Sequence, residues 1–596
     1  MKLAAFLIVL TLLRLAVIGH VELSPDEAYY HEWSQRLDWC YFSKGPGVAV
    51  AMRVSTAIFG HSEFGVRFFA PILALGTSLI LYWLARRMYE DRVAFWAVVV
   101  MNLTPLFNAG GLVMSIDPLS IFFWTAALAT LWLALEQGSG DEPRFSLWWP
   151  ASGLLIGLGF LCKWTNAFQL LSVLLLLLLT PRYRKELRRP GFYVMLLAFL
   201  PALYPVCVWQ SARGWPLLAH LSARGGLETP WWRFDTKDFG AFVGLHLVVY
   251  SPLLFLGMVI ALGTETRESF QRWWKAVLLC VPSIPGGLKR HWGATLFVLL
   301  LALAFYFAGN FWDEYSFLHK GAIVTLVFGA LVGIAQCKDA ANVHWRSRFI
   351  AAFALPIIFV YLWIALHHDS EVNWTAPGFV GLFILVTAYY IDRVSRRLLA
   401  WTCGTAVALS LVGGITDLAR MIGIPWPSKW DQTTRVRGWA ESARAVDRFR
   451  GEMEKELKRP IFLIGENYGV AAELCYYLPP RPPEALGHPA CYVLESVVPE
   501  NQFHFWPRYD DYVERQMPKN LLNDQEDSLE IGTCPFAGRT AIYVTTREEK
   551  KCPDIINSTF GSWQIMRDVE IKENGRVLRK LRFFIFHRYN PGAIMN

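Results

Sequence analysis

Long apolar stretches separated by short polar loops make up the chain as far as about Gly423. A helix needs about 20 mostly apolar residues to cross the hydrocarbon core of a bilayer. The pattern therefore predicts a polytopic α-helical membrane protein with about thirteen transmembrane helices. These helices are expected to begin near Leu3, Phe64, Val93, Asp117, Leu147, Asn166, Gly191, Gly240, Gly293, His319, Phe349, Trp374 and Leu398.

After about residue 420, short apolar runs alternate with amphipathic ones. The runs RPIFLIG, ACYVLES, TAIYVTT and LRFFIFHRY predict strands, and NYGVAAELCYYL predicts a helix. Alternation of strands and helices is typical of a small α/β domain. The sequence thus divides into a transmembrane domain, residues 1–420, and a soluble α/β domain, residues 421–596.

Lys and Arg residues gather in the loops that follow every second expected span. Short cytoplasmic loops carry an excess of these residues, which identifies this side as the cytoplasm. The N-terminus is therefore expected inside, and an odd number of spans places residues 421–596 outside the inner membrane of the cell. The loop residues are Arg86, Arg87, Arg92, Arg182, Arg184, Lys185, Arg188, Arg189, Arg267, Arg272, Lys275, Lys289, Arg290, Lys338, Arg346, Arg348, Arg393, Arg396 and Arg397.

The composition agrees with a membrane protein and argues against a nucleic-acid binder. Hydrophobic residues make up 54% of the chain and charged residues only 18%, against about 25% charged in soluble domains. The net charge of +8 at pH 7 is carried by the short loops, where membrane orientation and lipid head groups account for it. Membrane lipids are therefore expected partners, and nucleic acid is not.

Four of the ten cysteines lie in the expected outer domain. An outer location permits up to two disulfides among Cys475, Cys491, Cys534 and Cys552, and the pairing stays open. None of the four has the C-x-x-C spacing that is typical of a metal cluster.

Two outer loops are too long for simple connections. Residues 20–63 contain the amphipathic stretches AYYHEWSQRLDW and KGPGVAVAMRVSTAIFG, which are expected to lie in the plane of the membrane interface. Residues 210–239 are rich in aromatic and basic side chains.

The adjacent carboxylates of Asp26 and Glu27 directly follow the first span, in SPDEAYYHEW. A carboxylate at this membrane edge is suited to accept a proton from an acceptor hydroxyl, while its neighbour orients it or holds a cation. Ser24-Pro25-Asp26-Glu27 is also a good helix start, because acids are favoured in the first turn. The sequence leaves both interpretations open.

Further charged residues are expected at the same membrane edge. Asp117, in LVMSIDPLSIFFW, opens a span where ionisable residues are costly and usually functional, although helix capping is the alternative. Lys44, in YFSKGPGVAV, and Lys163, in FLCKWTN, are candidates for binding a phosphate, with head-group snorkelling the alternative for Lys44. Arg67, in EFGVRFFA, either joins them or neutralises the carboxylates by charge pairing.

The outer segment HHDSEVNWTAPGF, from His367, offers His, Asp369 and Glu371 as metal ligands. Their spacing fits no strong metal template, and Trp374 serves equally well as an interface anchor. The metal site is therefore unknown, and a divalent cation is left as an open alternative.

Several motifs, in order along the chain, resemble those of C-type glycosyltransferases. DEAYY, YFSKGPGVA, EFGVRFFA and SIDPLSIFFW resemble in particular the bacterial branch of the protein O-mannosyltransferase and aminoarabinose transferase superfamily. EVNWTAPGF, GENYGVAAELCYYL and NQFHFWPRY also resemble this branch. The resemblance implies the C-type glycosyltransferase fold with a C-terminal extracytoplasmic α/β domain.

The resemblance also assigns roles to residues. It implies Asp26 as catalytic base with Glu27 beside it, and Asp117 as a second active-site carboxylate. Lys44 matches a lysine that binds the donor phosphate, but K-G-P replaces K-P-P, and Ser43 stands where a metal-associated Glu is expected. No metal site is therefore carried over. The further expected donor-phosphate residues are Lys163, Arg224 and Arg67, and the expected acceptor or cavity residues are Tyr29, Tyr30, Glu371, Asn373 and Trp374.

The implied activity is the inverting transfer of a sugar from a polyprenyl-phosphate donor to a lipid, polysaccharide or protein on the outer face of the membrane. No glycine-rich phosphate loop is evident in the sequence, and this reaction needs no nucleotide. The alternatives are a transporter or flippase for a lipid-linked sugar, a polymer ligase, and a non-catalytic membrane scaffold. The transporter is disfavoured because the sequence has no inverted internal repeat.

Overall fold

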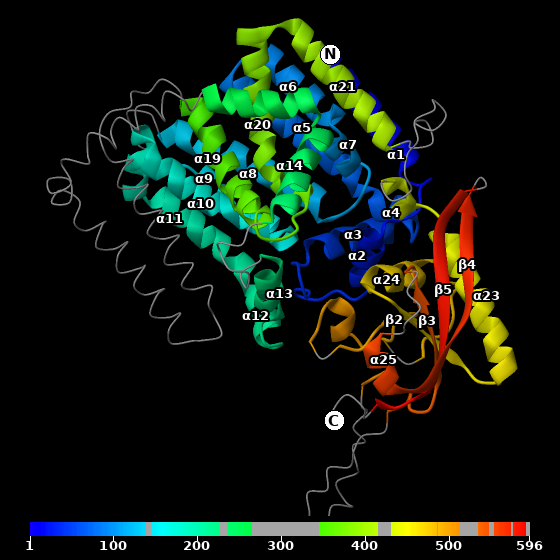
Figure 1. The fold of residues 1–596 in the computed structure, drawn as a ribbon. Helices are drawn as coiled ribbons and strands as arrows, with labels where there is room; N and C mark the ends of the chain where they lie inside the picture. The colour runs from blue at the N-terminus through cyan, green and yellow to red at the C-terminus, as the bar shows by residue number, and fades with distance from the viewer. Residues whose placement is uncertain are drawn as a thin grey trace, which may run out of the picture. The chain divides into compact units, whose positions relative to one another are not determined.

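The computed structural model describes residues 1–138, 145–225, 235–264, 345–414, 431–484, 487–496, 498–511, 534–547, 553–573 and 576–591. The chain separates into two compact units. Figure 1 shows its helices and strands, coloured by residue number from the N-terminus to the C-terminus. The first unit comprises residues 1–14, 44–47 and 69–414, and the second comprises residues 15–43, 48–68 and 415–596. Most of the first outer loop therefore folds as one unit with the C-terminal residues.

The regular secondary structure of the first unit is entirely helical among its described residues. α8 packs against α5 and α9, α9 against α11, and α20 against α6 and α19. Its main helices are α1 (Lys2–Val17), α5 (Phe69–Met88), α6 (Asp91–Leu103), α7 (Pro105–Gly110), α8 (Ile116–Gly138), α9 (Trp148–Cys162), α10 (Phe168–Leu179), α11 (Pro190–Phe199), α12 (Leu203–Ser211), α13 (Pro216–Arg224), α14 (Thr236–Tyr250), α19 (Trp345–Ala365), α20 (Ala376–Tyr389) and α21 (Arg396–Gly414). Short turns of 3-10 helix include η1 (Trp164–Ala167), η2 (Pro181–Arg188), η3 (Leu200–Ala202) and η5 (Val372–Thr375).

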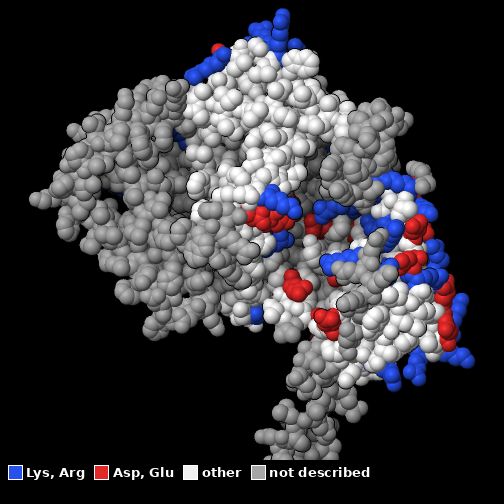
Figure 2. Space-filling view, viewed as in Figure 1, with Lys and Arg blue, Asp and Glu red and all other residues white. Residues whose placement is uncertain are grey.

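Five helical stretches of the described residues are long and apolar enough to cross a membrane, and two sharply bent helix pairs raise this number to seven at most. On the face shown in Figure 2, the helices of the first unit present a broad surface without charged residues, and Lys and Arg gather at its upper end. The chain is thus a polytopic helical membrane protein. The five stretches are Glu63–Met88, Ile116–Gly138, Pro190–Ser211, Trp345–Ala365 and Val372–Val394.

The number of thirteen spans stays a prediction. The expected spans near Gly293 and His319 lie outside the described residues. Those expected near Val93 and Leu147 are present as α6 and α9, with 13 and 15 residues, which is short for a bilayer crossing.

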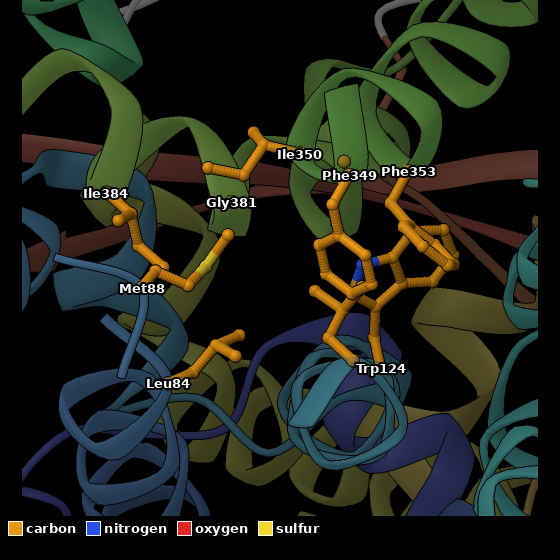
Figure 3. Close-up of a pocket in the computed structure, with 10 residues that line it drawn as sticks. Leu84, Met88, Trp124, Phe349, Ile350, Phe353, Gly381 and Ile384 are labelled. Carbon is orange, nitrogen blue, oxygen red and sulfur yellow. The ribbon is translucent and has the colours of Figure 1, made fainter. Parts of the chain in front are cut away.

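The helix core between α5, α8, α19 and α20 is filled by apolar side chains. Figure 3 shows Trp124 of α8 lying against Phe349 and Phe353 of α19, around a small pocket that Leu84 and Ile350 also line. All of the lining residues are apolar or glycine. This pocket offers no charge for a phosphate and belongs to the packing that holds the helices in place.

The second unit contains a five-stranded sheet with the order β2-β1-β3-β5-β4. β1 is parallel to β2 and β3, and β5 is antiparallel to β3 and β4. α23 and α24 pack against β1. The elements are α23 (Trp439–Leu457), β1 (Ile461–Gly465), α24 (Tyr468–Tyr477), β2 (Tyr492–Val493), η9 (Gln502–Phe505), β3 (Thr540–Thr545), α25 (Asp554–Thr559), β4 (Phe560–Glu573) and β5 (Arg576–Tyr589).

The strands expected from RPIFLIG, ACYVLES, TAIYVTT and LRFFIFHRY and the helix from NYGVAAELCYYL are all present, whereas β4 was not expected. β4 is an edge strand of 14 residues, and most of its side chains are not buried. Its sequence FGSWQIMRDVEIKE therefore lacks the apolar run that marks the buried strands. Pairing with the apolar β5 stabilises it.

The first outer loop supplies three helices, α2 (Pro25–Gln35), α3 (Gly47–Phe59) and α4 (Glu63–Arg67). Figure 1 shows α2 beside α24, and the two helices pack directly against each other. The backbone N–H groups of Trp439 and Ala440, at the start of α23, donate to the Glu22 carboxylate at 2.6 and 3.2 Å. The loop and the C-terminal residues thus share hydrogen bonds as well as a packed surface.

The disulfides that an outer location permits do not form among the described cysteines. Cys475, Cys491 and Cys534 are free thiols, and Cys552 lies outside the described residues. The Cys475 Sγ lies 3.5 Å from the carbonyl oxygen of Cys491, and burial raises the pKa of the Cys491 thiol to about 12. Both thiols are therefore protonated at neutral pH and poorly reactive.

Candidate active site

Asp117 is the centre of a polar cluster in the first unit. Its Oδ1 accepts a charged hydrogen bond from Lys163 Nζ at 2.5 Å, and its Oδ2 accepts one from Asn373 Nδ2 at 2.7 Å. The side chains of Asp117 and Lys163 are only 17% and 5% exposed. Three residues expected at the site thus meet from α8, the end of α9 and η5.

This cluster is held by two more polar contacts between the same segments. One turn after Asp117, the Ser120 hydroxyl donates to Asn166 Oδ1 at 2.5 Å, and Asn166 Nδ2 donates to the Ser120 carbonyl at 3.0 Å. Further along, Gln169 Nε2 donates to the Trp124 carbonyl at 3.0 Å. These buried polar groups pair with one another at helical spacing, which fixes the position of Lys163 relative to Asp117.

The segment Lys44-Gly45-Pro46-Gly47 lies against the end of α9, directly before Lys163. A side chain at Gly45 would overlap the Leu161 carbonyl group, and one at Gly47 would overlap the Cys162 sulfur. The two glycines therefore allow a backbone approach that no other residue permits. This contact gives a physical reason for K-G-P in place of K-P-P, because the loop that carries Lys44 is packed onto the residues that lead to Lys163.

A basic group extends the cluster. The Arg224 guanidinium stands over the Trp374 ring at 5.6 Å, next in sequence to Asn373. Burial, and then the positive charges of Lys44 and Arg224, lower the pKa of His220 from 6.5 to about 4. The charges of Lys44 and Arg224 thus both act on His220, whose imidazole is neutral at pH 7.

Glu371 does not join these contacts. Its side chain is exposed and makes no hydrogen bond or ion pair in the described part of the chain. The described residues also contain no group of three His, Cys, Asp or Glu side chains placed to hold a metal. In HHDSEVNW, the Nδ1 atoms of His367 and His368 instead face the backbone carbonyls of Trp363 and Asp369.

In the second unit, Asp26 lies in the first turn of α2. The Tyr468 hydroxyl, from the start of α24, donates to Asp26 Oδ1 at 3.1 Å. Asp26 Oδ2 has no hydrogen-bond partner among the described residues. Asp26 therefore presents one fixed and one available carboxylate oxygen.

Glu27 is fully enclosed, and its carboxylate is occupied. Arg67 donates to both of its oxygens at 2.7 Å, and the backbone and side chain of Ser24 donate to Oε2 at 3.0 Å. The remaining N–H groups of Arg67 donate to the carbonyls of Ile18, Val21 and Glu22. All five Arg67 donors are thus used inside the chain, which favours the charge-pairing interpretation of Arg67 over phosphate binding.

The two tyrosines that follow are packed rather than exposed. Tyr29 is 5% and Tyr30 9% exposed. The Tyr29 hydroxyl accepts the Gln502 backbone N–H at 2.6 Å, and its ring stacks on Phe503 with a centroid distance of 5.9 Å. Tyr29 therefore ties α2 to η9, and its hydroxyl is engaged.

Two members of these groups had no sequence signal of their own. His220 was visible only as one of many aromatic and basic residues in its loop, and Tyr468 only as part of a family-like motif. A tyrosine or histidine in a polar segment is common, so the significance of each comes from the neighbours that the fold brings to it.

Comparison with known proteins supports the resemblance. Residues 43–209, which include Lys44, Asp117 and Lys163, match the family model described as dolichyl-phosphate-mannose-protein mannosyltransferase. The undecaprenyl phosphate-alpha-4-amino-4-deoxy-L-arabinose arabinosyl transferase of Pseudomonas paraeruginosa is 29% identical over 56% of this chain and 57% of its own length. The lipid A galacturonosyltransferase RgtD of Rhizobium johnstonii is 25% identical over 47% of this chain and 59% of its own length. The chain thus spans less than two thirds of each of these relatives.

A solved structure has the same fold along nearly the whole chain. The crystal structure of ArnT from Cupriavidus metallidurans bound to undecaprenyl phosphate covers 98% of this chain and 97% of its own, with a TM-score of 0.50 and 14% identity. The resemblance to C-type glycosyltransferases that the sequence motifs indicate is therefore confirmed.

Proposed function

We propose that this chain is an inverting glycosyltransferase, which moves a sugar from a polyprenyl-phosphate donor to an acceptor outside the inner membrane. The observation that carries the proposal is the Lys163–Asp117 ion pair in the first unit, together with Lys44 and Arg224, whose charges both act on His220; among the described residues, these are three cations and one carboxylate. A lipid phosphate needs such an excess of positive charge as its negative charge increases during bond cleavage.

The proposed reaction uses the residues as follows. Asp26 accepts the proton of an acceptor hydroxyl, and the hydroxyl oxygen forms a bond to the anomeric carbon of the sugar. The bond between that carbon and the phosphate oxygen breaks, and the polyprenyl phosphate leaves with the electron pair. Lys44, Arg224 and Lys163 stabilise the leaving phosphate, and Asp117 orients Lys163 through their ion pair.

The other residues receive supporting roles. Glu27 and Arg67 hold the start of α2 through their buried ion pair, and Asn373 fixes the second oxygen of Asp117. Whether a divalent cation assists the leaving phosphate is measured by activity in EDTA with and without added Mg²⁺ or Mn²⁺. The proposed topology has the N-terminus in the cytoplasm and residues 421–596 outside.

The names of the relatives suggest the substrates to test. Undecaprenyl phosphate carrying 4-amino-4-deoxy-L-arabinose is the first donor, a polyprenyl phosphate carrying galacturonic acid the second, and lipid A the first acceptor. The purified chain in lipid nanodiscs is expected to produce lipid A with one added sugar, detected by mass spectrometry. Envelope polysaccharides and proteins from cells with and without the gene extend the search for acceptors.

The variant Lys44→Met tests the phosphate site, because it removes the proposed phosphate-binding charge from a half-buried position. Transfer is expected to fall by about 100-fold, since one electrostatic contact at a reacting centre contributes roughly 10²–10³ in rate. Donor movement across vesicles without any new glycosidic bond would instead identify a transporter. Full transfer by Lys44→Met would contradict the assignment of the phosphate site.

A further inference from the structure

The C-terminal residues reach the proposed base through one tyrosine. Tyr468 donates its hydroxyl proton to Asp26 Oδ1 at 3.1 Å, across 442 positions of sequence. Its ring also lies 4.6 Å from the ring of Tyr29, whose hydroxyl is held by the Gln502 backbone. Tyr468 thus contacts α2 at two residues about one helical turn apart, Asp26 and Tyr29, of which Asp26 is the proposed base.

The position of Tyr468 is fixed by the turn that connects β1 to α24. Asn467 caps α24, because its Oδ1 accepts the N–H groups of Gly469 at 2.9 Å and Val470 at 3.1 Å. Before it, Glu466 accepts the N–H and hydroxyl of Thr546 at 3.1 and 2.7 Å. The turn is therefore tied both to its own helix and to the end of β3.

The start of α24 also touches the start of α2. A side chain added at Gly469 would come within 2.9 Å of Pro25 Cβ, so a close approach next to Asp26 requires glycine here. This contact and the Tyr468 hydrogen bond lie at the same end of both helices. Asp26 is thus set against a turn that hydrogen bonds hold to α24 and to the end of β3.

The same turn lies at the edge of the sheet where α/β domains commonly place their sites. β1 is flanked by β2 on one side and β3 on the other, and both pairs are parallel. After β1 the chain passes through α24 to β2 on one side of β1, whereas β3 lies on the other side of β1. The carboxyl ends of β1 and β3 therefore form a topological switch point. Tyr468 follows the end of β1 at this point.

We propose that Tyr468 is a positioning residue for Asp26, which rests on the proposed function of Asp26 as the base. By holding Oδ1, the tyrosine orients the carboxylate so that Oδ2 receives the acceptor proton. The C-terminal residues therefore take part in acceptor activation. A donor that is bound through its phosphate in the first unit does not depend on this hydrogen bond.

The test compares Tyr468→Phe with Tyr476→Phe in the full-length chain. Both variants remove one hydroxyl from α24 and keep the ring, but the Tyr476 hydroxyl has no hydrogen-bond partner among the described residues. Tyr468→Phe is expected to lower kcat by about 10-fold, which corresponds to the loss of one hydrogen bond to a charged group. Its KM for the undecaprenyl-linked donor is expected to stay within about twofold, whereas Tyr476→Phe changes neither constant.

The outcomes separate this inference from the proposed function. Asp26→Asn is measured in parallel and is expected to abolish transfer. Unchanged kcat in Tyr468→Phe beside an inactive Asp26→Asn overturns the positioning role and leaves the base in place. An active Asp26→Asn overturns both, and an equal loss in Tyr476→Phe shows that the helix needs its tyrosines only for folding. Thermal unfolding of each variant in nanodiscs identifies that last case.

Discussion

Replacing Gly45 by alanine tests how closely the loop that carries Lys44 must approach α9. The added Cβ would lie 2.8 Å from the carbonyl carbon of Leu161 and 2.9 Å from its Cα, where ordinary contact begins at 3.4 Å. The Leu161 carbonyl oxygen lies closer still, and because this obstacle is backbone inside a packed helix end, the loop must retreat by roughly 1 Å. No charge is lost in this variant, so any effect arises from the displacement of Lys44.

The expected effect is large for a single methyl group. Displacing a binding or catalytic group by about 1 Å costs about 10²-fold in rate, so Gly45→Ala is expected to lower kcat/KM for the lipid-linked donor by about 10- to 100-fold. Gly110→Ala is the matched control, because a Cβ at Gly110 meets no atom within 4 Å. The assay is sugar transfer over a range of donor concentrations in nanodiscs. Equal kcat/KM in the two variants would refute the requirement for a close approach at Gly45.

Three further predictions follow from pairs and buried groups. Asp117→Asn is expected to lower transfer by about 100-fold with expression retained, and a rate near that of the parent chain would show that the Lys163 contact is structural only. Arg67→Met leaves Glu27 charged and buried, so it is expected to lower the free energy of unfolding by about 3–5 kcal/mol. Thermal unfolding measures the change, and an unchanged unfolding midpoint would contradict the stabilising role of the ion pair. Burial raises the pKa of Glu495 to about 7. The protonated Glu495 therefore contributes its full share to the free energy of unfolding below pH 4.5, and this contribution is lost as the pH rises through 7. Glu495→Gln is expected to remove this pH dependence, which amounts to about 1–3 kcal/mol of unfolding free energy at pH 8. If the unfolding free energies of the parent chain and of Glu495→Gln fall equally with pH, Glu495 is not its source.

The sequence indicated Asp117 because a charge at membrane depth is costly, and Lys163 because positive charge is otherwise scarce in the expected outer loops. It could not pair them, because their contact and that of Asn373 depend on helix packing across 46 and 256 positions. Glu27 and Arg67 show the limit of motif reasoning. Their residue types fit catalysis and phosphate binding, but the hydrogen bonds that use every donor of Arg67 form only in the folded chain.

The helical part of the fold followed from its apolar runs, and four strands followed from theirs. β4 did not, since an edge strand is stabilised by its neighbour and carries polar residues on most of its surface. The grouping of residues 15–43 and 48–68 with the C-terminal residues also had no local signal. It depends on hydrogen bonds such as those from Trp439 and Ala440 to Glu22, which connect distant parts of the chain.

The long separation between Asp26 and Tyr468 has a consequence for biosynthesis. A ribosome that adds about 5–20 residues per second needs roughly 20–90 s to pass from one to the other. During this time the spans between them enter the membrane, and α2 is synthesised but α24, against which it packs, is not yet. A nascent or truncated chain thus carries Asp26 before the turn that holds it, so the proposed activity is expected only after the last part of translation.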